Sequence, residues 1–310
     1  MRNGYPAGGH RRRSGRALRR GPVRRWTPVS QASYGDHLCL VSSRLAERRA
    51  VLSAFVGEGL ERDERVLYVY ANPESAAEVL GFLERDQWRR HLASGQLSVA
   101  SADDVYLSGD RFEPDRLLRI LRQEVESTLD AGWRGLRVTT EMNRALRHAP
   151  ARGPLVAYEK GLRAALARLP AMVVCQYDHR HARKAGLDRL HPGRLALDPL
   201  YSNGRLWIFP GFEPPGLRVQ GAVDAGTMDV FLAALAQLGE RTDDVGDSHL
   251  DLGELHFIDL DGLRHLAWVA SQLPTNRRLV LHRLSTHHRD LISLLNWDEI
   301  PQLCLDGSPS

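Results

Sequence analysis

The 310-residue sequence lacks the features that mark a membrane protein, a disulfide-bonded protein or a classical nucleotide hydrolase. No apolar run approaches the roughly 18–20 residues that span a bilayer, so no membrane helix is expected. The three cysteines form no disulfide framework and no Cys-x-x-Cys pair, which fits a reducing cytoplasm. Neither Gly-x-x-x-x-Gly-Lys-Ser/Thr nor Gly-x-Gly-x-x-Gly occurs, and this argues against classical ATP hydrolysis.

The formal net charge of +4 comes from the N-terminal segment and not from the body of the protein. Residues 1–30 contain nine arginines and no acidic residue, and outside them 33 basic residues face 38 acidic ones. The body is therefore mildly acidic, and we do not expect it to bind nucleic acid. The composition predicts that residues 1–32 form a disordered tail, because so little apolar surface cannot offset the entropy of ordering. An arm that touches nucleic acid or anionic lipid is the alternative.

Residues 33–212 alternate between strand-like apolar runs and helical spacing, which predicts a first domain. Strands are predicted at residues 38–41, 65–70, 135–139 and 171–175, and helices at residues 44–60, 114–129 and 155–169. Strands that alternate with helices of this length predict an α/β domain with a mainly parallel sheet covered on both faces. Ligands of such sheets bind beyond the carboxyl ends of the strands.

The candidate ligand-binding residues lie on or just after the predicted strands, and they are His37, Cys39, Glu141, Cys175, Tyr177, Asp178 and His191. Because strand side chains alternate between faces, His37 and Cys39 share one face, as do Cys175 and Tyr177. His37, Cys39 and Cys175 are the candidate metal ligands, since zinc and iron bind these residue types. Their spacing matches no zinc motif, and the alternative is that the cysteines are small buried apolar groups. A catalytic water polarised by Glu141 and Glu159 is a further alternative.

Short motifs in order along residues 33–212 carry a family resemblance. They are Gly35-Asp36-His37-Leu38-Cys39, Val138-Thr139-Thr140-Glu141-Met142, Tyr158-Glu159, Cys175-Gln176-Tyr177-Asp178 and His191-Pro192. The segment resembles the MEDS domain, the methanogen/methylotroph, DcmR-type sensory domain. The resemblance implies a RecA/KaiC-like core without a phosphate loop that senses a small molecule, such as a hydrocarbon derivative, with a metal held by His and Cys as one route. Asn143-Arg144 stands where family members often have a tryptophan after the Glu-Met pair. This departure bears on whether the family's ligand is shared more than on whether the fold is shared.

Proline and glycine become dense between residues 196 and 216, where regular structure is expected to break. We predict a linker at residues 213–216, with the sequence Glu-Pro-Pro-Gly, which is short and stiff enough to transmit orientation. Residues 217–307 then follow a β-α-β-α-β-α pattern. The pattern predicts a second, smaller α/β domain.

The second domain resembles the STAS domain, named for sulfate transporters and anti-sigma-factor antagonists. The resemblance is carried by Gly221-Ala222-Val223-Asp224, by the run from Leu250 to Asp259, and by Gly262-Leu263. In the antagonists, a Ser directly after the Asp is phosphorylated by a partner kinase, and the phosphate breaks the contact by repulsion and desolvation. Here Leu260 and Asp261 follow the Asp and have no hydroxyl, so this switch cannot operate at this turn.

The STAS resemblance implies that Asp259, Leu260, Asp261 and Gly262 bind an anti-sigma factor or a histidine-kinase-like ATPase protein. Three interpretations stay open: Leu260 is an apolar anchor, Asp261 weakens or retargets the binding, or the turn binds nothing. We expect a cytoplasmic, non-enzymatic signalling regulator whose first domain senses a small molecule or a metal state. The competing class is a metal- or nucleotide-dependent enzyme in the first domain.

Overall fold

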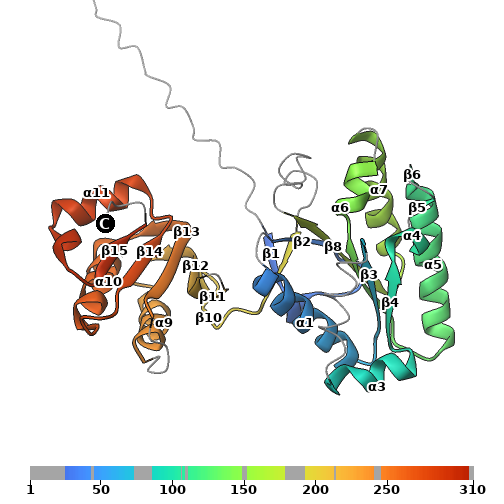
Figure 1. Cartoon of the computed structure of the whole chain (residues 1–310), viewed down its shortest axis with the longest axis horizontal. Coiled ribbons are helices and arrows are strands. Elements are labelled where there is room, and N and C mark those ends of the chain that lie inside the picture. Colours follow the sequence, from blue (N-terminus) through green and yellow to red (C-terminus); the bar gives the residue numbers. More distant parts are fainter. Residues whose placement is uncertain are drawn as a thin grey trace, which may run out of the picture.

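The computed structural model describes residues 25–42, 45–72, 86–105, 107–108, 111–148, 152–178, 193–212, 214–240 and 246–306. The first domain is built on a seven-stranded sheet in the order β1-β9-β2-β8-β7-β3-β4 (Figure 1). Its strands are β1 (Arg25–Pro28), β2 (His37–Ser42), β3 (Arg65–Tyr70), β4 (Leu97–Ser101), β7 (Leu136–Glu141), β8 (Ala171–Asp178) and β9 (Gly193–Ala196). Neighbouring strands pair in parallel, so the predicted α/β class with a mainly parallel sheet is confirmed.

Helices cover both faces of this sheet. The helical elements are η1 (Val29–Gln31), α1 (Leu45–Glu61), α3 (Asp86–Ser94), α4 (Ala102–Val105), α5 (Pro114–Asp130), α6 (Asn143–His148) and α7 (Arg152–Leu166), and a small hairpin pairs β5 (Leu107–Ser108) with β6 (Arg111–Phe112). One core cluster joins α1 to one face of the sheet, and a second joins α5 and α7 to the other face. No helix in the described part of the chain has the length and apolar character needed to cross a bilayer.

Strand alternation divides the sheet's side chains between these two cores. Leu38 and Leu40 of β2 and Val174 of β8 belong to the core beneath α1. Cys39 of β2 and Cys175 of β8 belong to the core beneath α7. The sheet face that carries these cysteines therefore turns toward α5 and α7, and both cysteines are buried there.

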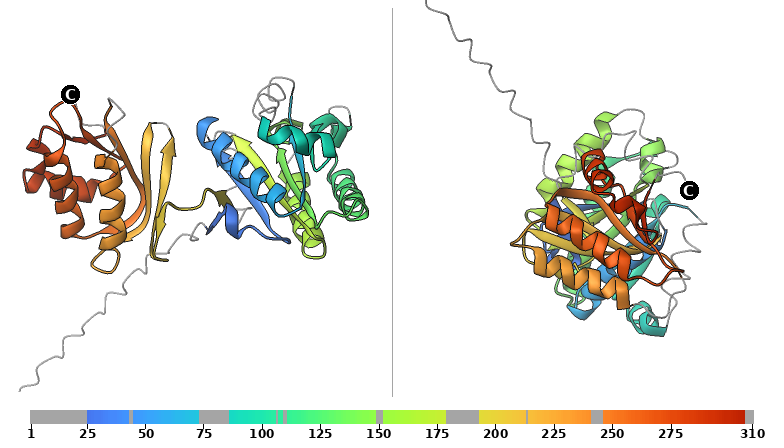
Figure 2. Two further views of the ribbon diagram at one scale, coloured as in Figure 1. Left: turned by 90° about the horizontal axis from the view of Figure 1, so that it is seen from below. Right: turned by 90° about the vertical axis from the view of Figure 1, so that its left-hand side faces the viewer.

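The second domain is built on a six-stranded sheet in the order β10-β11-β12-β13-β14-β15. Its elements are β10 (Tyr201–Ser202), β11 (Leu206–Phe212), β12 (Pro215–Val223), α9 (Met228–Glu240), β13 (Ser248–Ile258), α10 (Leu260–Gln272), β14 (Leu279–His282), α11 (Thr286–Leu294), η3 (Trp297–Glu299) and β15 (Leu303–Leu305). The first three strands pair antiparallel, and the rest pair in parallel. The helices share a core with one face of this sheet, on the side away from the first domain (Figure 2).

The boundary between the two domains differs from the one predicted from the proline and glycine content, as the pairing of β11 with β12 shows. Residues 213–216 were predicted to be a linker, but Pro214 lies at the hairpin turn, and Pro215 and Gly216 are the first residues of β12, which pairs with β11. Leu206 and Ile208 of β11 are buried in the core of the second domain. The prediction was wrong because a tight hairpin turn needs the same prolines and glycines as a linker. The connection between the two sheets lies instead at residues 197–200.

The predicted tail also ends earlier than composition indicated. Residues 1–24 lie outside the described residues, but the prediction was wrong for residues 25–32. β1 pairs in parallel with β9 at the edge of the first sheet. Val29 and Ala32 are each only 1% exposed and pack in the core beneath α1. The apolar residues Trp26, Val29 and Ala32 were the available signal, which the arginine content of the preceding residues outweighed.

Candidate functional site

A buried cluster of polar side chains lies between the first sheet and α7. His37 at the start of β2 places Nε2 3.4 Å from the Cys175 Sγ atom of β8. Its Nδ1 lies 3.4 Å from a carboxylate oxygen of Glu159, which α7 carries. The other Glu159 oxygen accepts a hydrogen bond of 3.1 Å from the Tyr177 hydroxyl. The Tyr158 hydroxyl lies 3.8 Å from the Cys175 sulfur.

Burial keeps the protons on the Cys175 thiol and the Tyr177 phenol at neutral pH. It raises the pKa of the Cys175 thiol well above the ordinary value of 9.0, and the nearby Glu159 carboxylate raises it further. Burial likewise raises the pKa of the Tyr177 phenol, with the Cys175 and Glu159 charges adding to the effect. Without a bound cation, Cys175 is therefore a neutral thiol and a poor nucleophile.

The donor set of this cluster fits a metal ion. One ligand atom each from His37, Glu159 and Cys175 lies within 4.8 Å of the others, and all three residues are buried. Imidazole nitrogen, carboxylate oxygen and thiolate sulfur are the ligand types that zinc and iron bind. A cation bound there would supply the positive charge that the Cys175 thiolate needs. Of the predicted metal ligands, His37 and Cys175 belong to this group, while Cys39 lies on the neighbouring strand in register with Cys175.

A second polar network lies on the opposite face of the sheet, beneath the first turn of α1. Arg48 of α1 forms an ion pair with Glu141 at the end of β7. Its Nε donates a hydrogen bond of 2.9 Å to the side chain of Gln176. Glu141 also accepts from the backbone N–H of Ala71 at 3.2 Å, and Gln176 donates to Thr139 at 2.8 Å. The sheet thus separates Glu141 from the cluster around Cys175.

The residues predicted to bind a ligand do not form a single site in the structure. His37, Cys175 and Tyr177 come together through Glu159, which had been considered only as a catalytic carboxylate. Asp178 is half-buried at the end of β8, where its backbone N–H donates to the Asn143 side chain at 2.9 Å. His191 lies outside the described residues.

Sequence reasoning gave Arg48 no role and left Glu159 out of the candidate site, yet both carried a readable signal. Glu159 precedes Leu162 and Leu166 by three and seven positions, so it lies on the buried face of α7. Arg48 stands in the same relation to Val51 and Phe55 of α1. A charged residue on the apolar face of a helix is the pattern that identifies both.

The turn predicted to bind a partner lies at the start of α10. Asp259 is the N-cap residue, and its side chain accepts a hydrogen bond of 2.8 Å from the Gly262 N–H. A Cβ atom on Gly262 would lie 2.7 Å from Ile258 and 2.8 Å from Val223, so only glycine fits beneath the turn. The glycine therefore fixes the approach of α10 to β12 and β13.

Apolar side chains are exposed around this turn. Leu260, the first residue of α10, is 48% exposed, and Trp268 lies two turns later on the same face of the helix at 59%. Phe257, at the end of β13, is also exposed. Asp261 pairs with Arg264 at 2.9 Å on the surface. The turn therefore presents an apolar residue where a phosphorylated antagonist has its hydroxyl.

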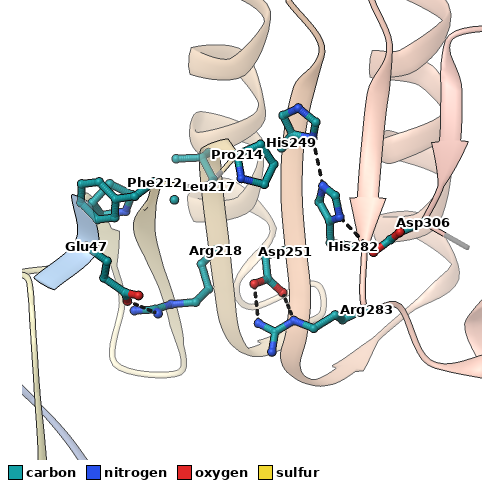
Figure 3. A pocket seen from close by; sticks show the side chains of 12 residues that line it. Glu47, Phe212, Pro214, Leu217, Arg218, His249, Asp251, His282, Arg283 and Asp306 are labelled. Atoms are coloured by element: carbon teal, nitrogen blue, oxygen red, sulfur yellow. Dashed lines mark hydrogen bonds and ion pairs between the residues drawn. The ribbon is translucent and has the colours of Figure 1, made fainter. Parts of the chain in front are cut away.

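A cavity of about 150 Å³ lies where the open face of the second sheet meets the first domain (Figure 3). Its charged and polar lining residues are Glu47, Arg218, His249, Asp251, His282, Arg283 and Asp306. They form two ion pairs, Glu47 with Arg218 and Asp251 with Arg283, and a chain in which His282 bridges His249 at 2.9 Å and Asp306 at 3.1 Å. Two of the three carboxylates are paired with the two guanidinium groups, and the third, Asp306, bonds to His282.

Each of the two domains matches the model of a known protein family. A family model described as the methanogen/methylotroph, DcmR sensory domain, MEDS, matches residues 36–192. The chain belongs to the MEDS family. A second model, described as Mlab, STAS domain, matches residues 211–305, so the predicted order of a MEDS domain followed by a STAS domain is confirmed. This pair of domains indicates a signalling or regulatory protein.

Two solved structures are similar to part of the chain at low sequence identity. The KaiC-like protein PH0186 of Pyrococcus horikoshii OT3 is 10% identical, with a TM-score of 0.39, over 61% of this chain and 80% of that one. The flagellar accessory protein FlaH of Methanocaldococcus jannaschii is 11% identical, with a TM-score of 0.38, over 62% and 80% of the two chains. No curated protein sequence matches the chain.

Proposed function

We propose that the protein is a non-enzymatic signalling regulator whose MEDS domain senses a small ligand or metal ion and whose STAS domain binds an anti-sigma factor or a kinase-type partner. The observation that carries the proposal is the exposed Leu260 at the start of α10. The cap of Asp259 and the close approach at Gly262 preserve the turn, while the residue after the cap is apolar.

A contiguous group of exposed apolar side chains marks an interaction surface, whereas a single exposed leucine does not. Apolar anchors that enter a partner's pocket carry much of the energy of protein interfaces. Phe257 and Trp268 extend the exposed apolar surface near Leu260. Kinase activity has no hydroxyl to modify at this position, so control enters from the MEDS domain in this proposal.

Binding measurements with purified anti-sigma factors and histidine-kinase-like ATPase proteins from the source genome test the partner. Leu260→Lys is expected to weaken the binding at least about 10-fold, because a charge enters the apolar contact. Leu129→Lys is the matched control, since Leu129 is 46% exposed on α5 of the other domain and should leave binding unchanged. Failure of every candidate to bind the unmodified chain, or equal binding by Leu260→Lys, contradicts the proposal.

The non-enzymatic part of the proposal is supported by the state of the two carboxylates considered for catalysis. Glu141 is engaged by Arg48 and the Ala71 N–H, and Glu159 by Tyr177 and His37. Both are buried, and they lie on opposite faces of the sheet. Neither is placed to activate a water molecule against a substrate together with the other.

The sensing part of the proposal is supported by the cluster of His37, Glu159 and Cys175. Elemental analysis of the purified full chain is expected to find about one zinc or iron per chain, as three buried ligands of this kind imply. The metal should be lost in Cys175→Ala and Glu159→Gln and retained in Cys304→Ala, the control cysteine of the second domain. Metal content that does not depend on Cys175 and Glu159 contradicts this route.

A further inference from the structure

We propose that the first turn of α1 couples the MEDS domain to the STAS domain, because two consecutive residues, Glu47 and Arg48, bond to the two domains separately. The proposal rests on the proposed function only in taking the MEDS domain as the input and the STAS domain as the output. It names the path by which a change at the buried cluster reaches the partner-binding turn.

The inward half of the path is Arg48. Helix α1 begins at Leu45, only three residues after β2 ends at Ser42, so its first turn lies over the carboxyl ends of the neighbouring strands. Arg48 pairs with Glu141 of β7 and donates to Gln176 of β8. Gln176 directly follows Cys175, whose side chain is on the other face of the same strand. A ligand that displaces β8 at Cys175 therefore displaces the hydrogen-bond partner of Arg48.

The outward half of the path is Glu47. Its carboxylate accepts a hydrogen bond of 3.0 Å from Arg218, which lies on β12 of the STAS domain (Figure 3). The Arg218 guanidinium lies 5.2 Å from the ring centres of both Trp26 and Phe209. Trp26 comes from β1 of the MEDS domain and Phe209 from β11 of the STAS domain, so Arg218 is held between the two domains.

Arg218 depends on Glu47 for its charge balance. Its side chain is only 16% exposed, and its Nε is buried without a hydrogen-bond partner in the described part of the chain. A cation in this position is destabilised when its carboxylate moves away. The position of Glu47 therefore determines how firmly β12 is held against the MEDS domain.

Two strands continue the path from Arg218 to the partner-binding turn. From Arg218, β12 continues to its last residue, Val223, whose carbonyl accepts a hydrogen bond of 3.0 Å from the Asp259 N–H. Arg218 is also in register with Asp251 of β13, the strand that ends at Ile258 just before Asp259. The pairing of β12 with β13 shifts register between Arg218 and Gln220 and between Gly221 and Ala222, and it resumes at Ala222 and Val223. A shift of Arg218 is thus carried along these two strands to the cap of α10.

Hydrogen exchange of the full chain tests the coupling without a ligand or a partner. Arg48→Met removes the bonds to Glu141 and Gln176, which both lie inside the MEDS domain, yet it is expected to speed the exchange of amides in β12 and β13 at least about 3-fold. Arg65→Met is the matched control, because Arg65 is 18% exposed and pairs with Glu124 inside the same domain. Equal exchange of β12 and β13 in the two variants would overturn the proposal.

Glu47→Gln keeps the test decisive even if Arg48→Met does not fold, since it leaves the Arg48 network intact. It should speed the exchange of the same two strands, and adding Arg48→Met should produce no further increase. Because coupling is reciprocal, Arg218→Gln should speed the exchange of β7 and β8. Additive effects, or effects confined to the mutated domain, contradict the coupling. Failure to find a metal or a partner would count against the proposed function and leave this result standing.

Discussion

The two sheets of the molecule use their faces differently. Every residue of β7 is buried, because helices cover both faces of the first sheet. Burial alternates along β12 from Leu217 and along β13 as far as Leu252, because helices cover one face of the second sheet and the other carries charged residues toward the cavity and the first domain. The first sheet can therefore enclose a buried polar cluster, whereas the second offers a charged face to a neighbouring domain.

Ion pairs give the largest test of this contrast. Glu64→Ala, at the position just before β3, leaves Arg137 of the first sheet, which is 0% exposed, as a buried cation without its carboxylate, and should lower the free energy of unfolding by about 3–5 kcal/mol. Asp251→Ala removes the partner of Arg283, which is 56% exposed, and should cost no more than about 1 kcal/mol. Urea denaturation measures both, and similar losses would remove the contrast.

The hydroxyl of Tyr177 gives a smaller effect inside the first sheet's polar cluster. Tyr177→Phe leaves a buried oxygen of Glu159 without this donor and should lower the free energy of unfolding by about 1–3 kcal/mol. Tyr201→Phe, at a half-buried position of the second domain, is the control and should change it by less than about 0.5 kcal/mol. A silent Tyr177→Phe would show that the cluster is wetter than its burial indicates.

The start of α10 provides a test on the exposed side of the comparison. Asp259→Ala removes the cap that accepts the Gly262 N–H and should lower the free energy of unfolding of the second domain by about 1 kcal/mol. Asp261→Ala removes a surface pair with Arg264 and should be nearly neutral. Equal losses would mean that the turn is not held by its cap. Denaturation followed by hydrogen exchange assigns the change to its domain.

The smallest effects are expected from pH, and they have opposite signs in the two domains. Folding raises the pKa of the Cys175 thiol above its ordinary value of 9.0. The resulting stabilisation is fully present below pH 9.0, and it is lost as the pH rises from there toward the pKa of the folded state. Burial and His282 lower the pKa of His249 from 6.5, so its contribution is present above 6.5 and is lost as pH falls below it. Cys175→Ala should flatten the alkaline loss and His249→Gln the acidic loss in unfolding measured across pH. The reverse assignment would contradict the comparison.

Much of the fold could be predicted because alternation and helical spacing are local. The period of two in β2 and β8 placed His37 with Cys39, and Cys175 with Tyr177, on the faces where the structure has them. The domain boundary could not be predicted in the same way, because Pro210, Pro214 and Gly216 suit a linker and a hairpin turn equally. Only the pairing of β11 with β12 distinguishes the two.

The candidate site was predicted by residue type more than by arrangement. Both His37 and Cys175 were identified, but Glu159 joins them only because α7 packs against that face of the sheet. Glu141, predicted for the same site, is on the opposite face and binds Arg48. Contacts between elements far apart in the chain depend on packing, which no local pattern encodes.

By itself, the sequence determined the order of a MEDS and a STAS domain, the sheet faces of the cysteines, and the loss of the hydroxyl after Asp259. These follow from residue identity and from the fixed geometry of strands and turns. Only the tertiary structure decided that Glu159 completes the cluster, that Trp26 belongs to the fold, and that Glu47 meets Arg218 across the two domains. Each of these is a contact between distant segments, and it forms because burying apolar faces brings their polar side chains within bonding distance.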